Sequence, residues 1–303
     1  MRTTPILIAL TLVSPACIEL DDAELSETDL SDTEQSVQLP GYSIVETTGT
    51  STGADKLVRA NCSDKTVVLG SSWRATDLAG TTIDTVVASA SAVSATSPGG
   101  MPGNAWLFLA HSTTNTPYNV HVRLVCATAP AGFQLVTSST PPTNSSTALA
   151  VATCPTGKQV TGGGYTISDS SNQGIAGEPT AFFPTLNGAS WVVGATPPRG
   201  TPNWTLTAYA LCADAAALPG YQIISAQTPV SVGDKQLVTS CPKSIAMTSA
   251  GWAARHGSNN ALVVGRATLH DIDPTGGTVQ TNAQNRSGLS PKWSLEQRAV
   301  CLN

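Results

Sequence analysis

The stretch CPTGKQVTGGGY, Cys154 to Tyr165, places a lysine beside a glycine and then three glycines in a row. This composition resembles a phosphate-binding loop, but such a loop has its glycines before the lysine and a helix after it. Here Lys158 precedes the glycine triplet, Gln159 follows the lysine, and the surrounding residues are typical of strands. The stretch therefore predicts a strand and no nucleotide site.

The stretch belongs to one of three copies of a unit that appears when the chain is compared with itself. Each copy begins with Gly and an aromatic residue, and a cysteine follows that aromatic by 20 or 21 positions. Eleven positions later comes another aromatic, and near the end an aromatic precedes a second cysteine by eight positions. At the place of the glycine triplet the other copies have GSS and SAG, so only small size is shared. Small residues indicate close contact between strands.

The predicted units are 40–130, 131–217 and 218–303, about 88 residues each. Their closing segments, YNVHVRLVC and WTLTAYALC, alternate apolar and polar residues with a period of two, which is typical of half-buried strands. Other runs rich in Val, Thr and Ile are separated by Gly, Pro, Asn and Ser. The sequence therefore predicts an all-β fold, arranged either as one pseudo-threefold β-prism or as three tandem β-sandwiches.

Six cysteines fall two per unit, and in an exported chain this arrangement predicts one disulfide in each. The predicted pairs are Cys62 with Cys126, Cys154 with Cys212, and Cys241 with Cys301. Each pair closes a loop of about 60 residues, which stabilises the fold by about 4 kcal/mol in the loop-closure estimate. Zinc is the alternative, but no further Cys or His lies at ligand spacing beside these cysteines, so no metal site is predicted.

The second unit resembles a repeat of exported bacterial proteins, written C-P-x-G-K-x-V-x-G-G-G and later W-x-L-x-A-Y-A-x-C. The first and third units match it at cysteines, aromatics and some small residues. The resemblance covers nearly all of residues 40–303 and implies no activity. More distantly, the three units resemble the vitelline-membrane outer-layer prism, which implies three sheets around a pseudo-threefold axis and no particular function.

The N-terminus, MRTTPILIALTLVSPAC, has the pattern of an export signal, with an apolar run followed by small residues. The signal peptide is predicted at 1–16. Either ordinary cleavage before Cys17 or lipidation of Cys17 fits, and the odd number of cysteines favours lipidation. Residues 17–39 carry eight Asp or Glu and no Lys or Arg, which predicts an acidic disordered tether.

The charge and hydropathy of the chain argue against several classes of binding partner. The chain has 20 acidic and 15 basic residues, and once the tether's eight acids and the leader's single arginine are set aside, the remainder is nearly neutral. This balance argues against nucleic acid and against an anionic membrane surface. No later apolar run approaches the roughly 18 residues of a membrane span, so we expect membrane contact only through a lipid on Cys17.

Few residues suggest chemistry. GTSTG at 49–53 matches the string of a nucleophile elbow but lacks the strand-turn-helix context. The stretch HDIDPTGG concentrates His270, Asp271 and Asp273 near a turn, and is the only candidate for a catalytic or metal site. No cofactor is expected. The six tryptophans are expected to pack in the core, since another unit has an aromatic at each equivalent place.

Residues that have no counterpart at the corresponding position of the other units are better candidates for function. They are predicted in one variable loop per unit: SPGGMPGN with Met101, EPTAFFPTLNG with Phe182 and Phe183, and HDIDPTGG. The leading hypothesis is a non-catalytic, exported binding or adhesion module of the cell envelope, lectin-like, with surface carbohydrate or an envelope protein as its ligand. The alternatives are a purely structural envelope protein and, third, a hydrolase or metal site at His270, Asp271 and Asp273.

Overall fold

The computed structural model describes residues 39–93, 103–171, 173–175, 177–197, 201–262, 265–273, 275–285 and 292–303. Met101, Cys17, the predicted signal peptide and nearly all of the tether lie outside these residues. All described residues belong to one compact unit, Ser36–Asn303. The regular secondary structure of the described part is all β-strand, as predicted, apart from one short 3-10 helix, η1 (Ala215–Ala217).

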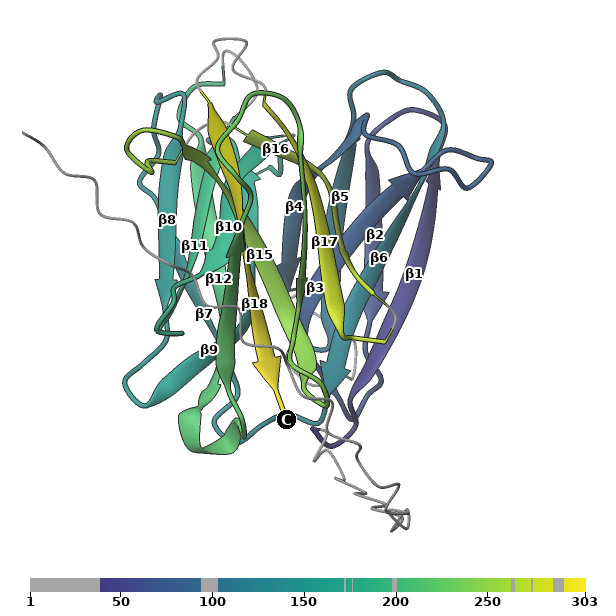
Figure 1. Ribbon diagram of the computed structural model, residues 1–303. Coiled ribbons are helices and arrows are strands. Elements are labelled where there is room, and N and C mark those ends of the chain that lie inside the picture. Colours follow the sequence, from purple (N-terminus) through teal and green to yellow (C-terminus); the bar gives the residue numbers. More distant parts are fainter. Residues whose placement is uncertain are drawn as a thin grey trace, which may run out of the picture. The chain divides into compact units, whose positions relative to one another are not determined.

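Six strands come from each predicted unit (Figure 1). The first unit supplies β1 (Ser43–Ser51), β2 (Lys56–Asn61), β3 (Val67–Thr76), β4 (Val86–Val93), β5 (Ala105–Ser112) and β6 (Tyr118–Ala127). The second supplies β7 (Gln134–Ser139), β8 (Ala148–Thr153), β9 (Lys158–Ser168), β10 (Glu178–Pro184), β11 (Ser190–Thr196) and β12 (Thr205–Asp214). The third supplies β13 (Gln222–Gln227), β14 (Lys235–Ser240), β15 (Ala246–His256), β16 (Gly265–Ile272), β17 (Thr278–Asn285) and β18 (Trp293–Leu302).

The strands form three six-stranded sheets, and each sheet joins two of the predicted units. Sheet A has the order β1-β6-β3-β16-β17-β14, sheet B the order β2-β5-β4-β9-β12-β7, and sheet D the order β13-β18-β15-β10-β11-β8. In every sheet the first, sixth and third strands of one unit adjoin the fourth, fifth and second strands of another. The prediction of three tandem sandwiches is therefore wrong, because no unit has a sheet of its own.

The third strands of the units, β3, β9 and β15, contact one another where the three sheets meet. The small residues of CPTGKQVTGGGY and its counterparts lie at this meeting point. A Cβ on Gly162 would lie 2.0 Å from the Leu69 carbonyl oxygen, and one on Gly70 would lie 2.2 Å from the Thr248 carbonyl oxygen. Glycine is required here because backbone approaches backbone. Lys158, at the start of β9, pairs with Asp214 at 2.6 Å.

The core confirms two predictions. All three disulfides form as predicted, Cys62–Cys126, Cys154–Cys212 and Cys241–Cys301. All six tryptophans are buried. The aromatic residues that follow the first cysteine of each unit, Trp73, Tyr165 and Trp252, face the interior together with the apolar residues of β6, β12 and β18. Each also pairs across a junction between units, with His270, Ser91 and Phe182 respectively.

The opening Gly-aromatic pairs have a packing role that the sequence did not indicate. Tyr42, Phe133 and Tyr221 each lie against a glycine of a hairpin loop from another unit, Gly276, Gly103 and Gly188 respectively. The backbone carbonyls of the same three glycines accept hydrogen bonds from Met247, Val68 and Val160. These three glycines are therefore held against the body of the sheets.

Candidate functional site

The phenylalanines predicted in a variable loop lie in a strand. Phe182 and Phe183 are in β10 and are 6% and 7% exposed. Phe182 points inward, with its ring 4.9 Å from that of Trp191 and 5.6 Å from that of Tyr165. Their placement in a ligand-binding loop is wrong, because the apolar run FF fits a strand buried on both faces better than a surface turn.

The three polar residues of HDIDPTGG do not come together. His270, in β16, is 2% exposed and faces inward, where its ring nitrogens contact Thr281 Oγ1 at 2.9 Å and the Ala250 carbonyl oxygen at 3.0 Å. Asp271 follows it in the strand and faces the opposite side of the sheet, since side chains alternate. Asp273 lies in the turn after β16, where it accepts hydrogen bonds from Thr275 and Thr278. The candidate catalytic or metal cluster is therefore not formed.

Burial lowers the pKa of His270 to about 4, despite the hydrogen bond to Ala250. The imidazole is therefore neutral near pH 7. Its hydrogen bonds join β16 to β15 and β17, and Gln297 of β18 donates to the same Thr281 hydroxyl at 2.6 Å. His270 is thus part of a buried polar network in the interior.

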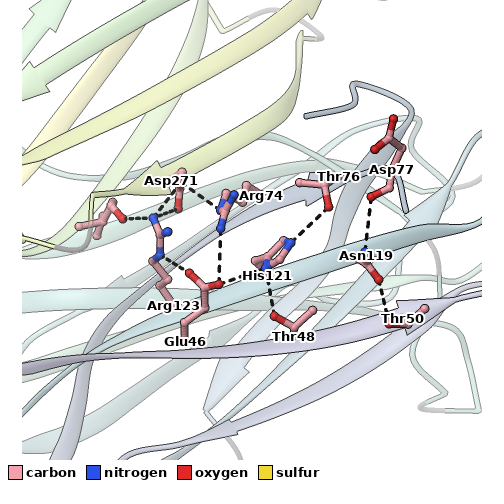
Figure 2. A network of polar contacts seen from close by, with 11 residues as sticks. Glu46, Thr48, Thr50, Arg74, Thr76, Asp77, Asn119, His121, Arg123 and Asp271 are labelled. Atoms are coloured by element: carbon pink, nitrogen blue, oxygen red, sulfur yellow. Dashed lines mark hydrogen bonds and ion pairs between the residues drawn. The ribbon is translucent and has the colours of Figure 1, made fainter. Parts of the chain in front are cut away.

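On the outer face of sheet A, Asp271 joins a charged network that links two units (Figure 2). Arg123 of β6 donates to both carboxylate oxygens of Asp271, at 2.8 and 2.9 Å, and to Glu46 of β1 at 2.7 Å. Arg74 of β3 lies 3.4 Å from Glu46 and 3.6 Å from Asp271. His121 Nδ1 lies 3.1 Å from Glu46. The network connects β1, β6 and β3 of the first unit to β16 of the third.

The pKa values of the two carboxylates in this network are shifted in opposite directions. Burial opposes ionisation of Glu46, but hydrogen bonds from Arg123 and His121 and the charge of Arg74 hold its pKa below the ordinary value. Burial raises the pKa of Asp271 in spite of Arg123 and Arg74. Every charged member has a partner within the network, which is the arrangement expected of a structural ion-pair cluster.

Sheet D has a similar junction with different chemistry. Phe183 occupies the position of Asp271, and the guanidinium carbons of Arg298 and Arg255 lie 4.7 and 5.4 Å from its ring centroid. Arg298 donates to the Pro184 carbonyl at 2.9 Å, as Arg123 donates to the Ile272 carbonyl at 2.8 Å. Both arginines therefore hold two units together, one through a carboxylate and one through a cation–π contact.

One interior space between described residues is small. Where β3, β4, β9, β10, β15 and β16 meet, a space of about 20 Å³ remains, lined by residues that include Tyr165, Phe182 and His270. This is room for about one water molecule. The space is too small for a substrate or cofactor.

A groove lies on the outer side of β14, β16 and β17. It has two adjoining parts, of about 240 and 380 Å³. Asp84, Thr268 and Asn282 line both parts. The first part is also lined by Asp234, Lys235, Gln236, Ala283 and Gln284, and the second by Thr82, Ile83, Thr85 and Leu269. The groove lies toward the opposite ends of β16 and β17 from the turn that carries Asp273.

The walls of the groove are fixed by contacts between units. Gln284 donates to Asp84 Oδ2 at 2.7 Å, and Arg266 donates to the Asp84 carbonyl at 3.2 Å and to Gln284 Oε1 at 3.0 Å. Gln280 donates to Asn282 Oδ1 at 3.0 Å. The segment 82–85 of the first unit is thereby held against the third unit.

The floor contains Thr268, which is the extra residue of a β-bulge between Ala267 and Leu269. Bulges turn a side chain away from its regular direction and are common beside functional sites. Thr268 is 3% exposed, and its hydroxyl forms no hydrogen bond to any other described residue. The hydroxyl oxygen is not fully buried, so a ligand or a water in the groove can reach it.

In one row of the groove the side chains are polar where the matching surfaces of the other sheets are mostly apolar. Five positions before the first cysteine of each unit stand Gln236, Leu149 and Leu57. Their partners on the neighbouring strand are Asn282, Gly194 and Leu109. One row further along, Gln280 of β17 corresponds to Val192 of β11 and Leu107 of β5. In that row the residues paired with them are Val238, Val151 and Arg59, so it is the polar pair Gln236 and Asn282 that distinguishes the β14–β17 surface.

Sequence reasoning missed this groove. A signal was present, because Gln280, Asn282 and Gln284 alternate with apolar or small residues in TVQTNAQN and so must share one face of a strand. Their proximity to Asp84 was not visible, since about 200 residues separate Asp84 from Gln284.

No protein-family model matches the chain, and no curated protein is significantly similar to it. Within the described residues no group of three or more His, Cys, Asp or Glu side chains is arranged to hold a metal ion. The same residues contain no helix with the length and hydropathy needed to cross a bilayer.

Proposed function

We propose that the protein is an exported, non-catalytic binding module of the cell envelope that recognises carbohydrate through the groove beside β14, β16 and β17. The observation that carries the proposal is the polar pair Gln236 and Asn282 in the groove, where the matching surfaces have Leu149 with Gly194 and Leu57 with Leu109. Side-chain amides offer both donors and acceptors, as does Thr268 through its hydroxyl. A polyhydroxylated ligand needs both at each of its hydroxyls.

The scaffold also suits a binding role. The groove walls belong to β-strands and to a segment tied by hydrogen bonds, so they are held in place before a ligand arrives. A volume of about 240 to 380 Å³ lies at the lower end of the range for small-molecule sites, which suits one or two sugar rings. The non-catalytic part of the proposal is supported by the separation of His270, Asp271 and Asp273.

The test is a glycan array followed by calorimetry with the full chain purified after export. Gln236→Leu and Asn282→Leu introduce the residues that the first unit has at the same places, Leu57 and Leu109. We expect each variant to remain folded and to lose at least about tenfold in affinity, which corresponds to about 1.4 kcal/mol. Leu57→Gln is the matched control on sheet B and should bind as the unchanged protein does.

Two outcomes would contradict the proposal. If the folded protein binds no envelope carbohydrate, the purely structural alternative gains support. If it binds carbohydrate and Leu57→Gln weakens binding as much as Gln236→Leu does, the binding site lies elsewhere.

A further inference from the structure

Carboxylates outnumber cations among the described residues that line the groove. Asp84 and Asp234 both line it and are exposed at the surface. One carboxylate oxygen of Asp84 accepts the bond from Gln284, whereas Asp234 forms no hydrogen bond or ion pair with any other described residue. Both carboxylates therefore retain acceptor sites that face solvent.

The cations nearby are committed elsewhere. Lys235 is 8% exposed, and its ammonium donates to the Ser231 hydroxyl and to the Val232 carbonyl and lies 5.5 Å from the Trp293 ring centroid. Arg266 is also buried; it donates to the Asp84 backbone carbonyl and to Gln284 and lies 3.7 Å from Glu178 of β10, while its Nε and Nη1 form no hydrogen bond to a described residue. Among the described residues that line the groove, two carboxylates, Asp84 and Asp234, stand against one cation, Lys235.

A ligand for this groove therefore needs hydroxyl groups for the amides and Thr268, and a positive charge for the carboxylates. We propose that the groove selects amino sugars with a free, protonated amine over neutral and acidic sugars. The inference depends on the proposed function, because it names the class of carbohydrate that the same groove takes. Thr268 supports it independently of the charges, because its side chain lies in the floor and its hydroxyl, which has no partner among the described residues, can be reached from the groove.

The amine is expected to lie near Asp84 and Asp234, since a charge-assisted hydrogen bond is about twice as strong as a neutral one. The surface position of both carboxylates makes the attraction sensitive to salt, which screens exposed charges over about 10 Å at 0.1 M. A carboxylated sugar meets like charge at the same place and is rejected.

The test measures the full chain with glucose, glucosamine and glucuronic acid by ligand-observed NMR at about pH 6, where amines are protonated. These three sugars differ chiefly in charge. We expect glucosamine to bind about tenfold more tightly than glucose at low salt, and glucuronic acid to bind more weakly than glucose. The preference should shrink in 0.5 M salt and at a pH where the amine is neutral.

Asp84→Asn with Asp234→Asn should bring the affinities for glucosamine and glucose close together. Asp55→Asn is the matched control, because Asp55 stands seven positions before Cys62 as Asp234 does before Cys241. It should leave the preference unchanged. Retention of the disulfides and of a cooperative unfolding transition shows that a variant is folded.

The outcomes separate this inference from the proposed function. Equal binding of glucose and glucosamine, or a preference that survives the double variant, overturns the inference and leaves carbohydrate binding intact. No binding of any sugar by the folded protein overturns both. A short lysine peptide that competes as well as glucosamine would show that the groove recognises a cation and not an amino sugar.

Discussion

The outer surface of β14, β17 and β16 and that of β8, β11 and β10 have the same strand order but opposite character. The first carries Gln236, Gln280 and Asn282, and the second carries Leu149, Val192 and Gly194 at the matching positions. The inward-facing residues of the two regions have the same partners: Phe182 and His270 each pair with a tryptophan across a junction between units. Interior positions are constrained by packing against the other sheets, whereas outer positions are free to differ.

This contrast separates two kinds of residue. Those that recur between units, such as the disulfides and the small residues of β3, β9 and β15, maintain the fold. Those that differ on an outer surface are available for recognition. Substitutions at recurring positions should therefore change stability, and exchanges at differing positions on the outer surface should change binding alone.

The largest effect is expected from the disulfides. Replacing both Cys154 and Cys212 by Ala should lower the free energy of unfolding by about 4 kcal/mol, because the unfolded chain regains the freedom of a closed loop. The three loops span 58, 60 and 64 residues, so the three double variants should give similar losses in denaturant unfolding. Losses that differ by more than about 2 kcal/mol would argue that the units contribute unequally.

A smaller loss is expected where the sheets meet. Gly162→Ala places a methyl group 2.0 Å from the Leu69 carbonyl oxygen and should cost about 3 kcal/mol by overpacking. Gly174→Ala is the control, since no atom lies within 4 Å of its Cβ position, and it should change stability by less than about 0.5 kcal/mol. Similar values for the two variants would refute close approach of backbones as the role of the glycine triplet.

Acid should destabilise the junction in sheet A, which contains His270, but not the matching junction in sheet D, which has Phe182 at that place. The pKa of His270 is lowered to about 4, so as the pH falls below about 6.5 the unfolded chain binds a proton that the folded chain does not. Stability should fall by on the order of 3 kcal/mol between pH 6.5 and pH 4.

His270→Phe installs the residue found at the same place in sheet D, Phe182, and should remove this slope. Glu46, whose pKa is lowered, contributes stability that is lost at still lower pH in both proteins. Denaturant unfolding at a series of pH values measures the difference. An unchanged slope in the variant would show that His270 is not the titrating group.

The smallest effect on stability is expected at the outer surfaces. Gln236→Leu and its reciprocal Leu149→Gln should each change the free energy of unfolding by less than about 0.5 kcal/mol, because both side chains are solvent-exposed. Thermal unfolding checks this value. A large loss of stability in Gln236→Leu would mean that the polar surface stabilises the fold. The contrast between recurring and differing positions would then not hold.

The sequence was informative wherever a pattern depends on neighbours along the chain. Period-two alternation in YNVHVRLVC predicted β6, and the spacing of cysteines and aromatics predicted all three disulfides and the buried tryptophans. It failed at Phe182, Phe183 and His270, where polar and turn-forming neighbours suggested loops. These residues lie in β10 and β16, strands that pair with strands of another unit.

By itself, the sequence determined the all-β class, strands such as β6 and β12, and the three disulfides, because alternation and covalent spacing are local properties. Only the tertiary structure decided that every unit is divided between two sheets. Residues that are close in the sequence do not specify which strands pair along their edges. The same pairing brings Asp84 beside Gln284 and Asp234 into one groove with them. CPTGKQVTGGGY thus occupies the meeting point of the sheets, and the proposed site is formed by residues from two distant units.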